Sequence, residues 1–135
     1  MPFITWNDTM SVGVETFDTQ HKKLVEMVNT LFDAMRQGKG RSVMGQVLDE
    51  LISYTTYHFA SEEELMQKHG YPGFVEHKKE HDSLTQQVEE LREKHRRGEL
   101  FITIETLDFL KAWLNNHILR TDMQYKSFFR NKGLR

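Results

Sequence analysis

The stretch FVEHKKEHDSLTQQVEEL, residues 74–91, carries the strongest indication of fold in the chain, because its apolar residues and histidines recur at one spacing. The positions on this stripe are Phe74, His77, His81, Leu84, Val88 and Leu91. Side chains three or four residues apart share one face of an α-helix. Both imidazoles of HKKEH are therefore expected to point into the protein, while the charged residues between them stay mostly in water.

The same spacing continues in three other segments, so four helices are expected in all. Their approximate ranges are 18–37, 42–69, 72–97 and 103–120. Asp18 and Thr103 are predicted N-caps, and Gly70 is a predicted helix-ending glycine. Residues 1–17 show no helical period and are expected to form an extended N-terminal arm. This organisation predicts an all-α fold, an up-down-up-down antiparallel four-helix bundle.

Composition narrows the class of protein. The length of 135 residues, with 28% charged and 38% hydrophobic residues, is typical of a single globular domain, here 1–135. The formal net charge of −2 gives no reason to expect nucleic acid as a partner. No segment approaches the roughly 20 apolar residues that span a bilayer, and the N-terminus lacks a secretory signal pattern. We therefore expect a cytoplasmic monomer without a membrane span.

The chain contains no cysteine, which excludes disulfides, thiolate nucleophiles and iron–sulfur clusters. Any metal must be held by nitrogen and oxygen. Each of the four predicted helices places at least one histidine on its inward stripe, and one also places a carboxylate there. These residues are His21, His58, Glu62, His77, His81 and His117.

A single inward histidine is most simply a core residue bonded to a hydroxyl or a carbonyl group. Five of them with a carboxylate are harder to explain in that way, because burying charged groups without partners costs several kcal/mol each. A metal centre makes such a cluster favourable. Residues four apart on a helix are offset by about 40° and roughly 6 Å, so His58 with Glu62 and the pair in HKKEH can converge on one ion or on two adjacent ions.

Asp122 is a candidate of a different kind, because it follows His117 by five residues. That offset is about 140° on an ideal α-helix. Asp122 can join the cluster only if the helix ends, bulges or bends between the two residues. The intervening sequence HILRTD contains no proline or glycine that would force such a change.

Imidazole and carboxylate ligands suit iron, zinc or manganese. The candidates are too many for one ion. If they hold two six-coordinate ions, with both carboxylates and one solvent-derived group bridging, a single coordination position stays open for a small ligand. Carboxylate-rich di-iron bundles use Glu-x-x-His on two helices, a motif that does not occur here. A site with fewer carboxylates is better suited to reversible dioxygen binding than to cleavage of the O–O bond.

These motifs resemble the hemerythrin family, in its bacterial single-domain form, over essentially the whole chain. The matching elements are FDTQHKKL around His21, HFASEEEL with His58 and Glu62, HKKEH with His77 and His81, and WLNNHILRTD with Trp113, His117 and Asp122. The resemblance implies a four-helix bundle with a non-haem di-iron centre, oxo- or hydroxo-bridged, that binds dioxygen.

The resemblance also implies a division of the metal ligands. One iron would be held by His77, His81 and His117, the other by His21 and His58, and Glu62 and Asp122 would bridge the two. Five apolar residues near these ligands look like the wall of an oxygen pocket: Leu24, Phe59, Trp113, Leu114 and Ile118. Ordinary core packing is the alternative for each of the five. The two remaining histidines, His69 and His95, are interpreted as non-ligands.

Three hypotheses about function follow. The leading one is an oxygen-binding protein that is not an enzyme and that carries, stores, delivers or scavenges dioxygen, with an oxygen-consuming protein as a potential recipient. The second is a di-iron oxidase or peroxidase that uses the same centre. The third is a sensor of oxygen or iron, although the chain offers no additional domain to receive a signal.

Overall fold

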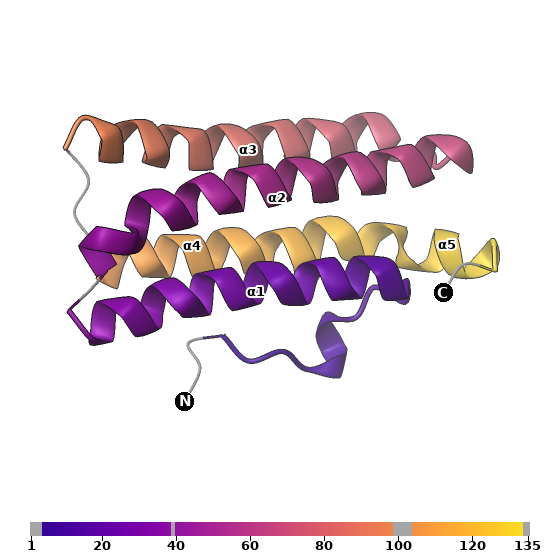
Figure 1. The fold of residues 1–135 in the computed structure, drawn as a ribbon. Coiled ribbons are helices and arrows are strands. Elements are labelled where there is room, and N and C mark those ends of the chain that lie inside the picture. Colours follow the sequence, from indigo (N-terminus) through magenta and orange to yellow (C-terminus); the bar gives the residue numbers. More distant parts are fainter. Residues whose placement is uncertain (1–3, 39, 99–103, 134–135) are drawn as a thin grey trace.

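The computed structural model describes residues 4–38, 40–98 and 104–133. Four long helices make up most of it: α1 (Glu15–Arg36), α2 (Gly40–Lys68), α3 (Phe74–Arg96) and α4 (Ile104–Asn116). They lie side by side, and each runs opposite to the one before it (Figure 1). No strand occurs among the described residues. The all-α fold class expected from the sequence is confirmed.

Helix α1 begins earlier than predicted, and Asp18 is not its N-cap. The N-cap is Val14, whose side chain cannot cap, and Asp18 lies inside the first turn. Its carboxylate accepts hydrogen bonds from Ser11 Oγ at 2.5 Å and from the backbone N–H of Val12 at 2.8 Å. A carboxylate in the first turn also suits the helix dipole. Asp18 therefore ties the preceding segment to α1.

The turn between α2 and α3 follows the expected chemistry at one position and departs from it at another. Gly70 has a φ of 68°, the left-handed conformation that glycine adopts at the end of a helix. The backbone N–H of Tyr71 bonds back to Met66 O at 2.9 Å and closes the last turn of α2. Helix α3 begins at Phe74 rather than at Pro72. The predicted cap Thr103 lies outside the described residues.

The chain beyond α4 differs most from the sequence prediction. The α-helix ends at Asn116, and three short elements follow: the π-helical turn η2 (His117–Thr121), the 3-10 turn η3 (Asp122–Tyr125) and the helix α5 (Lys126–Asn131). Together they continue the direction of α4 to the end of the bundle (Figure 1). The predicted helix 103–120 is thus an α-helix followed by a change of helical type.

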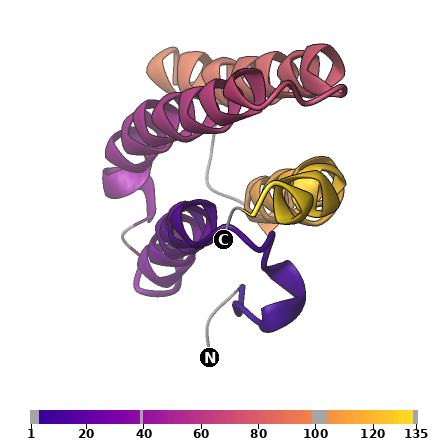
Figure 2. The same cartoon turned by 90° about the vertical axis from the view of Figure 1, so that its right-hand side faces the viewer.

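The N-terminal segment runs along the outside of the bundle, near α1 and the end of α4 (Figure 2). It contains one 3-10 turn, η1 (Asp8–Met10). The backbone of Ile4 exchanges two hydrogen bonds of 2.8 Å with the side-chain amide of Asn29 on α1. Lys126 of α5 donates to Ser11 O at 3.0 Å. Hydrogen bonds therefore attach the N-terminal segment to the first helix, α1, and to the last, α5.

The buried apolar residues form two clusters, and their order along each helix shows that the histidines lie between them. On α1, Phe17 precedes His21, and Leu24, Val28 and Leu31 follow it. The aliphatic core is built mainly from residues such as Leu24, Leu31, Leu48, Leu51, Leu107, Leu110 and Leu114. The aromatic cap consists of Val12, Val14, Phe17, Met66, Tyr125 and Phe129.

No helix in the described part of the chain is both long enough and apolar enough to cross a membrane.

Candidate metal centre

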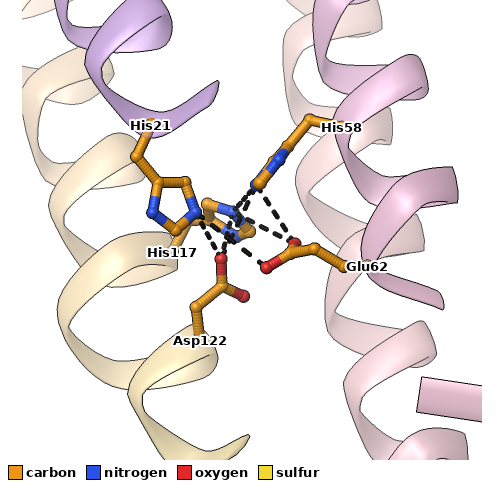
Figure 3. Close-up of side chains that lie close together, drawn as sticks. All are labelled: His21, His58, Glu62, His117 and Asp122. Carbon is orange, nitrogen blue, oxygen red and sulfur yellow. Dashed lines mark hydrogen bonds and ion pairs between the residues drawn. The ribbon is translucent and has the colours of Figure 1, made fainter. Parts of the chain in front are cut away.

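The structure brings all seven predicted ligand residues together in the middle of the bundle. Each is at most 2% exposed. They come from α1, α2, α3, η2 and the start of η3: His21, His58, Glu62, His77, His81, His117 and Asp122. Figure 3 shows five of them, with their polar atoms directed at one another. The periodic stripes in the sequence predict the inward direction of the five histidines and of Glu62, but not that of Asp122.

Asp122 reaches the cluster because of the π-helical turn. Its backbone N–H bonds to His117 O, five residues earlier, instead of to the carbonyl four residues earlier. This register puts one more residue into the turn, so an offset of five returns to the same face of the helix. Asp122 Oδ2 consequently lies 2.8 Å from His117 Nε2. The bulge that the spacing required is present.

The two carboxylates each contact imidazoles from different helices. Asp122 Oδ2 lies 2.6 Å from His21 Nε2, and its Oδ1 lies 2.9 Å from His77 Nε2. Glu62 Oε1 lies 3.1 Å from His58 Nε2 and 3.2 Å from His81 Nε2. Both acidic side chains therefore occupy the centre of the cluster, which is where bridging ligands would have to lie.

The potential ligand atoms fall into two overlapping groups, within each of which all atoms lie within 4.8 Å of one another. One group holds His21, His58, His117 and both carboxylates, and the other holds His77, His81 and both carboxylates. The resemblance implies instead that His117 belongs with His77 and His81. In the structure its Nε2 lies 3.0 Å from His58 Nε2. The division of ligands between two irons stays a prediction.

Burial lowers the pKa of three of the imidazoles. Desolvation, with smaller contributions from neighbouring charges, lowers the pKa of His21 to about 3 and that of His77 to about 4. The pKa of His117 is also well below its usual value, chiefly because of burial. These rings are therefore neutral near pH 7, and a neutral imidazole has the free lone pair that a metal ligand needs.

The pKa values of the two carboxylates are shifted in opposite directions. Burial raises the pKa of Asp122 well above its ordinary value, and the nearby charge of Glu62 adds to this. Burial acts in the same direction on Glu62, but the interaction with His58 and several hydrogen bonds outweigh it and hold the pKa of Glu62 well below normal. Two adjacent buried carboxylates resist ionising together without a cation. A bound metal would remove that conflict.

Several polar atoms inside the cluster have no hydrogen-bond partner among the described residues. Glu62 Oε1 and His81 Nε2 are both of this kind, although both are buried and only 3.2 Å apart. Unpartnered buried polar atoms are rare and call for an explanation. Their donor types, imidazole nitrogen and carboxylate oxygen, fit iron in a site without thiolate. The residues present thus fit a metal centre.

Three residues that the sequence analysis did not single out bond to the ligands from outside. His58 Nδ1 donates to Gln20 Oε1 at 2.5 Å, and His81 Nδ1 lies 2.9 Å from Glu63 Oε2. The phenol of Tyr125 donates to Glu62 Oε2. Gln20 and Glu63 are sequence neighbours of ligands, and Tyr125 follows Asp122 by one 3-10 turn, which are the signals that could have identified them.

The five predicted pocket residues are buried in the aliphatic core, each at most 4% exposed. The ring of Phe59 is stacked on His81, with 3.9 Å between centroids, and lies 4.9 Å from His117. Trp113 Nε1 donates to Leu84 O at 3.0 Å, so its only polar atom is occupied. The side of the cluster toward the aliphatic core is therefore apolar. His69 and His95 belong to neither ligand group.

The helical bundle and its buried cluster of histidines and carboxylates place the protein in the class of metal-binding helical bundles. The family model described as the hemerythrin HHE cation binding domain matches residues 12–129. The chain belongs to the hemerythrin family.

Three relatives illustrate the similarity. The bacteriohemerythrin of Methylococcus capsulatus is 41% identical over 126 residues, which cover 93% of this chain and 95% of the relative. That of Pseudomonas paraeruginosa is 40% identical over 125 residues, covering 93% of this chain and 80% of the relative. The crystal structure of a wild-type hemerythrin aligns with a TM-score of 0.84 at 40% identity, over 93% of this chain and 96% of that one.

Proposed function

We propose that the protein binds dioxygen reversibly at a di-iron centre and is not primarily an enzyme. The observation that supports this most directly is the position of the two carboxylates. Glu62 and Asp122 belong to both groups of potential ligand atoms, so each can contact two metal ions at once. Five imidazoles complete the set, and the two irons, when bound, supply the electrons that dioxygen takes on binding and returns on release.

The family resemblance implies how the ligands would divide. His77, His81 and His117 would hold one iron, His21 and His58 would hold the other, and Glu62 and Asp122 would be shared between them. His21 and His58 would form the smaller set, which would leave room on their side for a small ligand. The rings of this pair are 4.6 Å apart, between centroids, and nearly perpendicular.

The apolar residues of the aliphatic core keep this position dry. Leu24, Leu114 and Ile118 are fully buried in the aliphatic core. Water or anions entering the pocket would compete with a bound small ligand and would favour irreversible oxidation. A dry wall therefore favours reversible binding, which is the property that distinguishes a carrier or store from an oxidase.

Oxygen return from the protein tests the proposal. The protein is loaded with ferrous iron without air, and iron is counted per chain, with two expected. Oxygen is then admitted, the absorbance change is recorded, and a vacuum is applied. Recovery of the oxygen and of the ferrous spectrum is the expected result. Consumption of oxygen without its return would show an oxidase, and a stable ratio of one iron per chain would exclude the di-iron centre.

A further inference from the structure

The five imidazoles of the centre differ in what their outward nitrogens contact. The Nδ1 atoms of His21, His77 and His117 have no hydrogen-bond partner among the described residues. His58 Nδ1 meets the neutral amide oxygen of Gln20. His81 is the only one of the five whose Nδ1 faces a carboxylate, that of Glu63 at 2.9 Å. The five histidines therefore differ in the kind of group that faces the outward nitrogen.

The ring of His81 is held from three directions. Phe59 stacks on it with an interplanar angle of 3° and a centroid distance of 3.9 Å. Glu63 Oε2 fixes its outward nitrogen, and its inward Nε2 lies 3.2 Å from Glu62 Oε1. A carboxylate oxygen can only accept a hydrogen bond, so Nδ1 is the donor to Glu63, whereas Nε2 has no hydrogen-bond partner among the described residues. The lone pair of Nε2 is then directed at the metal position.

Glu63 lies between the cluster and the surface. Its side chain is 20% exposed, and it lines a surface groove of about 480 Å³ between α2 and α3. The other residues lining the groove include Asp82 and Glu89 but no lysine or arginine. Among the described residues, the ion pairs of Glu63 are limited to the one with His81. Within the described part of the chain, the carboxylate of Glu63 is therefore paired with this imidazole and not with a lysine or arginine.

We propose that Glu63 is a positioning residue that orients His81 and, through its negative charge, makes His81 the strongest electron donor among the five imidazoles. An anionic acceptor at Nδ1 draws the proton outward and raises the basicity of Nε2. A neutral amide, as at His58, does this less. The metal bound by His81 is then the one that is oxidised more easily. The biological meaning of this inference rests on the proposed function, but the first of the experiments below can be done without it.

Three variants separate the position of the side chain from its charge. Glu63→Gln keeps an oxygen acceptor and removes the charge, and Glu63→Ala removes both. Glu64→Gln is the matched control, because Glu64 is the next residue of α2, carries the same charge and is exposed to solvent. Glu63 lies near the surface, so these substitutions leave the buried ligands in place.

The first measurement needs no iron. Nitrogen-15 NMR of the metal-free protein reports which ring nitrogen of His81 carries the proton. Wild type, Glu63→Gln and Glu64→Gln are expected to hold it on Nδ1, whereas Glu63→Ala is expected to show both tautomers. The affinity for Co²⁺ should fall by about 10- to 100-fold in Glu63→Ala, the range for loss of a partner of a ligating histidine. An unchanged tautomer and affinity in Glu63→Ala would overturn the positioning role.

The second measurement follows the charge. In the iron-loaded protein, Glu63→Gln is expected to bind iron to the wild-type ratio and to raise the ferrous-to-ferric ratio at fixed potential about tenfold, which is 59 mV for a one-electron step. Equal potentials in Glu63→Gln and Glu64→Gln would overturn the donor role. If wild type fails to return oxygen while Glu63→Gln still shifts the potential, the proposed function fails and this inference stands.

Discussion

The aliphatic core and the aromatic cap pack against the metal centre from opposite sides, and they make different kinds of contact with it. On the core side, Phe59 contributes a ring face and Trp113 turns its N–H away to Leu84 O. On the cap side, Tyr125 donates a hydrogen bond to the carboxylate of Glu62, and its ring stacks on His77 at 5.5 Å. The core-side residues Phe59 and Trp113 contribute only ring surfaces, whereas Tyr125 on the cap side fixes the direction of a ligand.

The two sides also differ in how the chain builds them. The aliphatic core uses the interiors of the four long helices. The aromatic cap uses Val12 and Val14 from the N-terminal segment, together with Tyr125 and Phe129 from the residues that follow the π-helical turn. The comparison suggests that the ligand-orienting side depends on the docking of the chain ends, while the apolar side depends on bundle packing alone.

Removing a ligand should have the largest effect on metal binding, because the aliphatic core and the aromatic cap both pack around the same metal centre. His58→Ala or His77→Ala is expected to abolish loading with two irons, because each takes one nitrogen from a shared set. Metal analysis after anaerobic loading provides the measurement. His69→Ala is the control, since His69 lies outside both ligand groups. Two irons per chain with unaltered oxygen spectra in the ligand variants would refute the assignment.

Acidification of the metal-free protein should have the next largest effect. The pKa values of His21 and His77 are about 3 and 4 in the folded protein, below the ordinary value of 6.5. The unfolded chain therefore binds more protons below pH 6.5, and stability falls as the pH drops from about 6.5 toward 3, by several kcal/mol. The raised pKa of Asp122 opposes part of this loss. Urea unfolding across this pH range provides the measurement.

Bound metal should not remove that pH dependence. The ions keep the imidazoles deprotonated in the folded protein, so the unfolded chain still binds more protons below pH 6.5. A reversed trend, with the metal-free protein more stable at pH 5 than at pH 7, would contradict the description of the histidines as neutral and desolvated.

A cavity on the core side tests the dry wall. Leu114→Ala should cost about 2–5 kcal/mol of folding free energy and should also accelerate autoxidation, because the space admits water near His117. Leu110→Ala is the matched control: Leu110 is equally buried but lies one turn further from the ligand. Denaturant unfolding and the decay of the oxygenated spectrum give the two readings. Equal autoxidation rates in both variants would remove the pocket argument.

A change on the cap side should have the smallest effect on stability and a different effect on the site. Tyr125→Phe deletes the donor to Glu62 and leaves the ring packing in place, at a cost of about 1.5–3 kcal/mol for a hydrogen bond to a charged group. Tyr57→Phe, at an exposed position, is the control. Because Glu62 loses its orienting contact, weaker Co²⁺ binding is expected as well. Unchanged metal affinity would limit Tyr125 to packing.

The inward positions of the helices could be predicted from spacing, because a side chain on a core-facing stripe has little freedom of direction. This covers the histidines and Glu62. Gln20 and Glu63 could not be predicted in the same way, since each lies one residue from a ligand and thus about 100° around the helix. Their contacts depend on the distance between neighbouring helices, which no local pattern encodes.

The position of Asp122 could be predicted only in part from the sequence. The five-residue offset from His117 showed that a bulge was needed, but no proline or glycine indicated where the backbone would change register. Asp18 was misjudged for a related reason. Its acceptor atoms suggested an N-cap, whereas they bond to Ser11 and Val12 from within the first turn.

The π-helical turn also determines where the gene could tolerate a small deletion. Removing one codon between His117 and Asp122 would leave an i, i+4 pair that an ordinary α-helix aligns, so Asp122 and the residues after it could keep their directions. Removing one codon between Asp122 and Tyr125 has no such compensation. Tyr125 and Phe129 would then rotate by about 100° relative to α4, away from the rings they pack against.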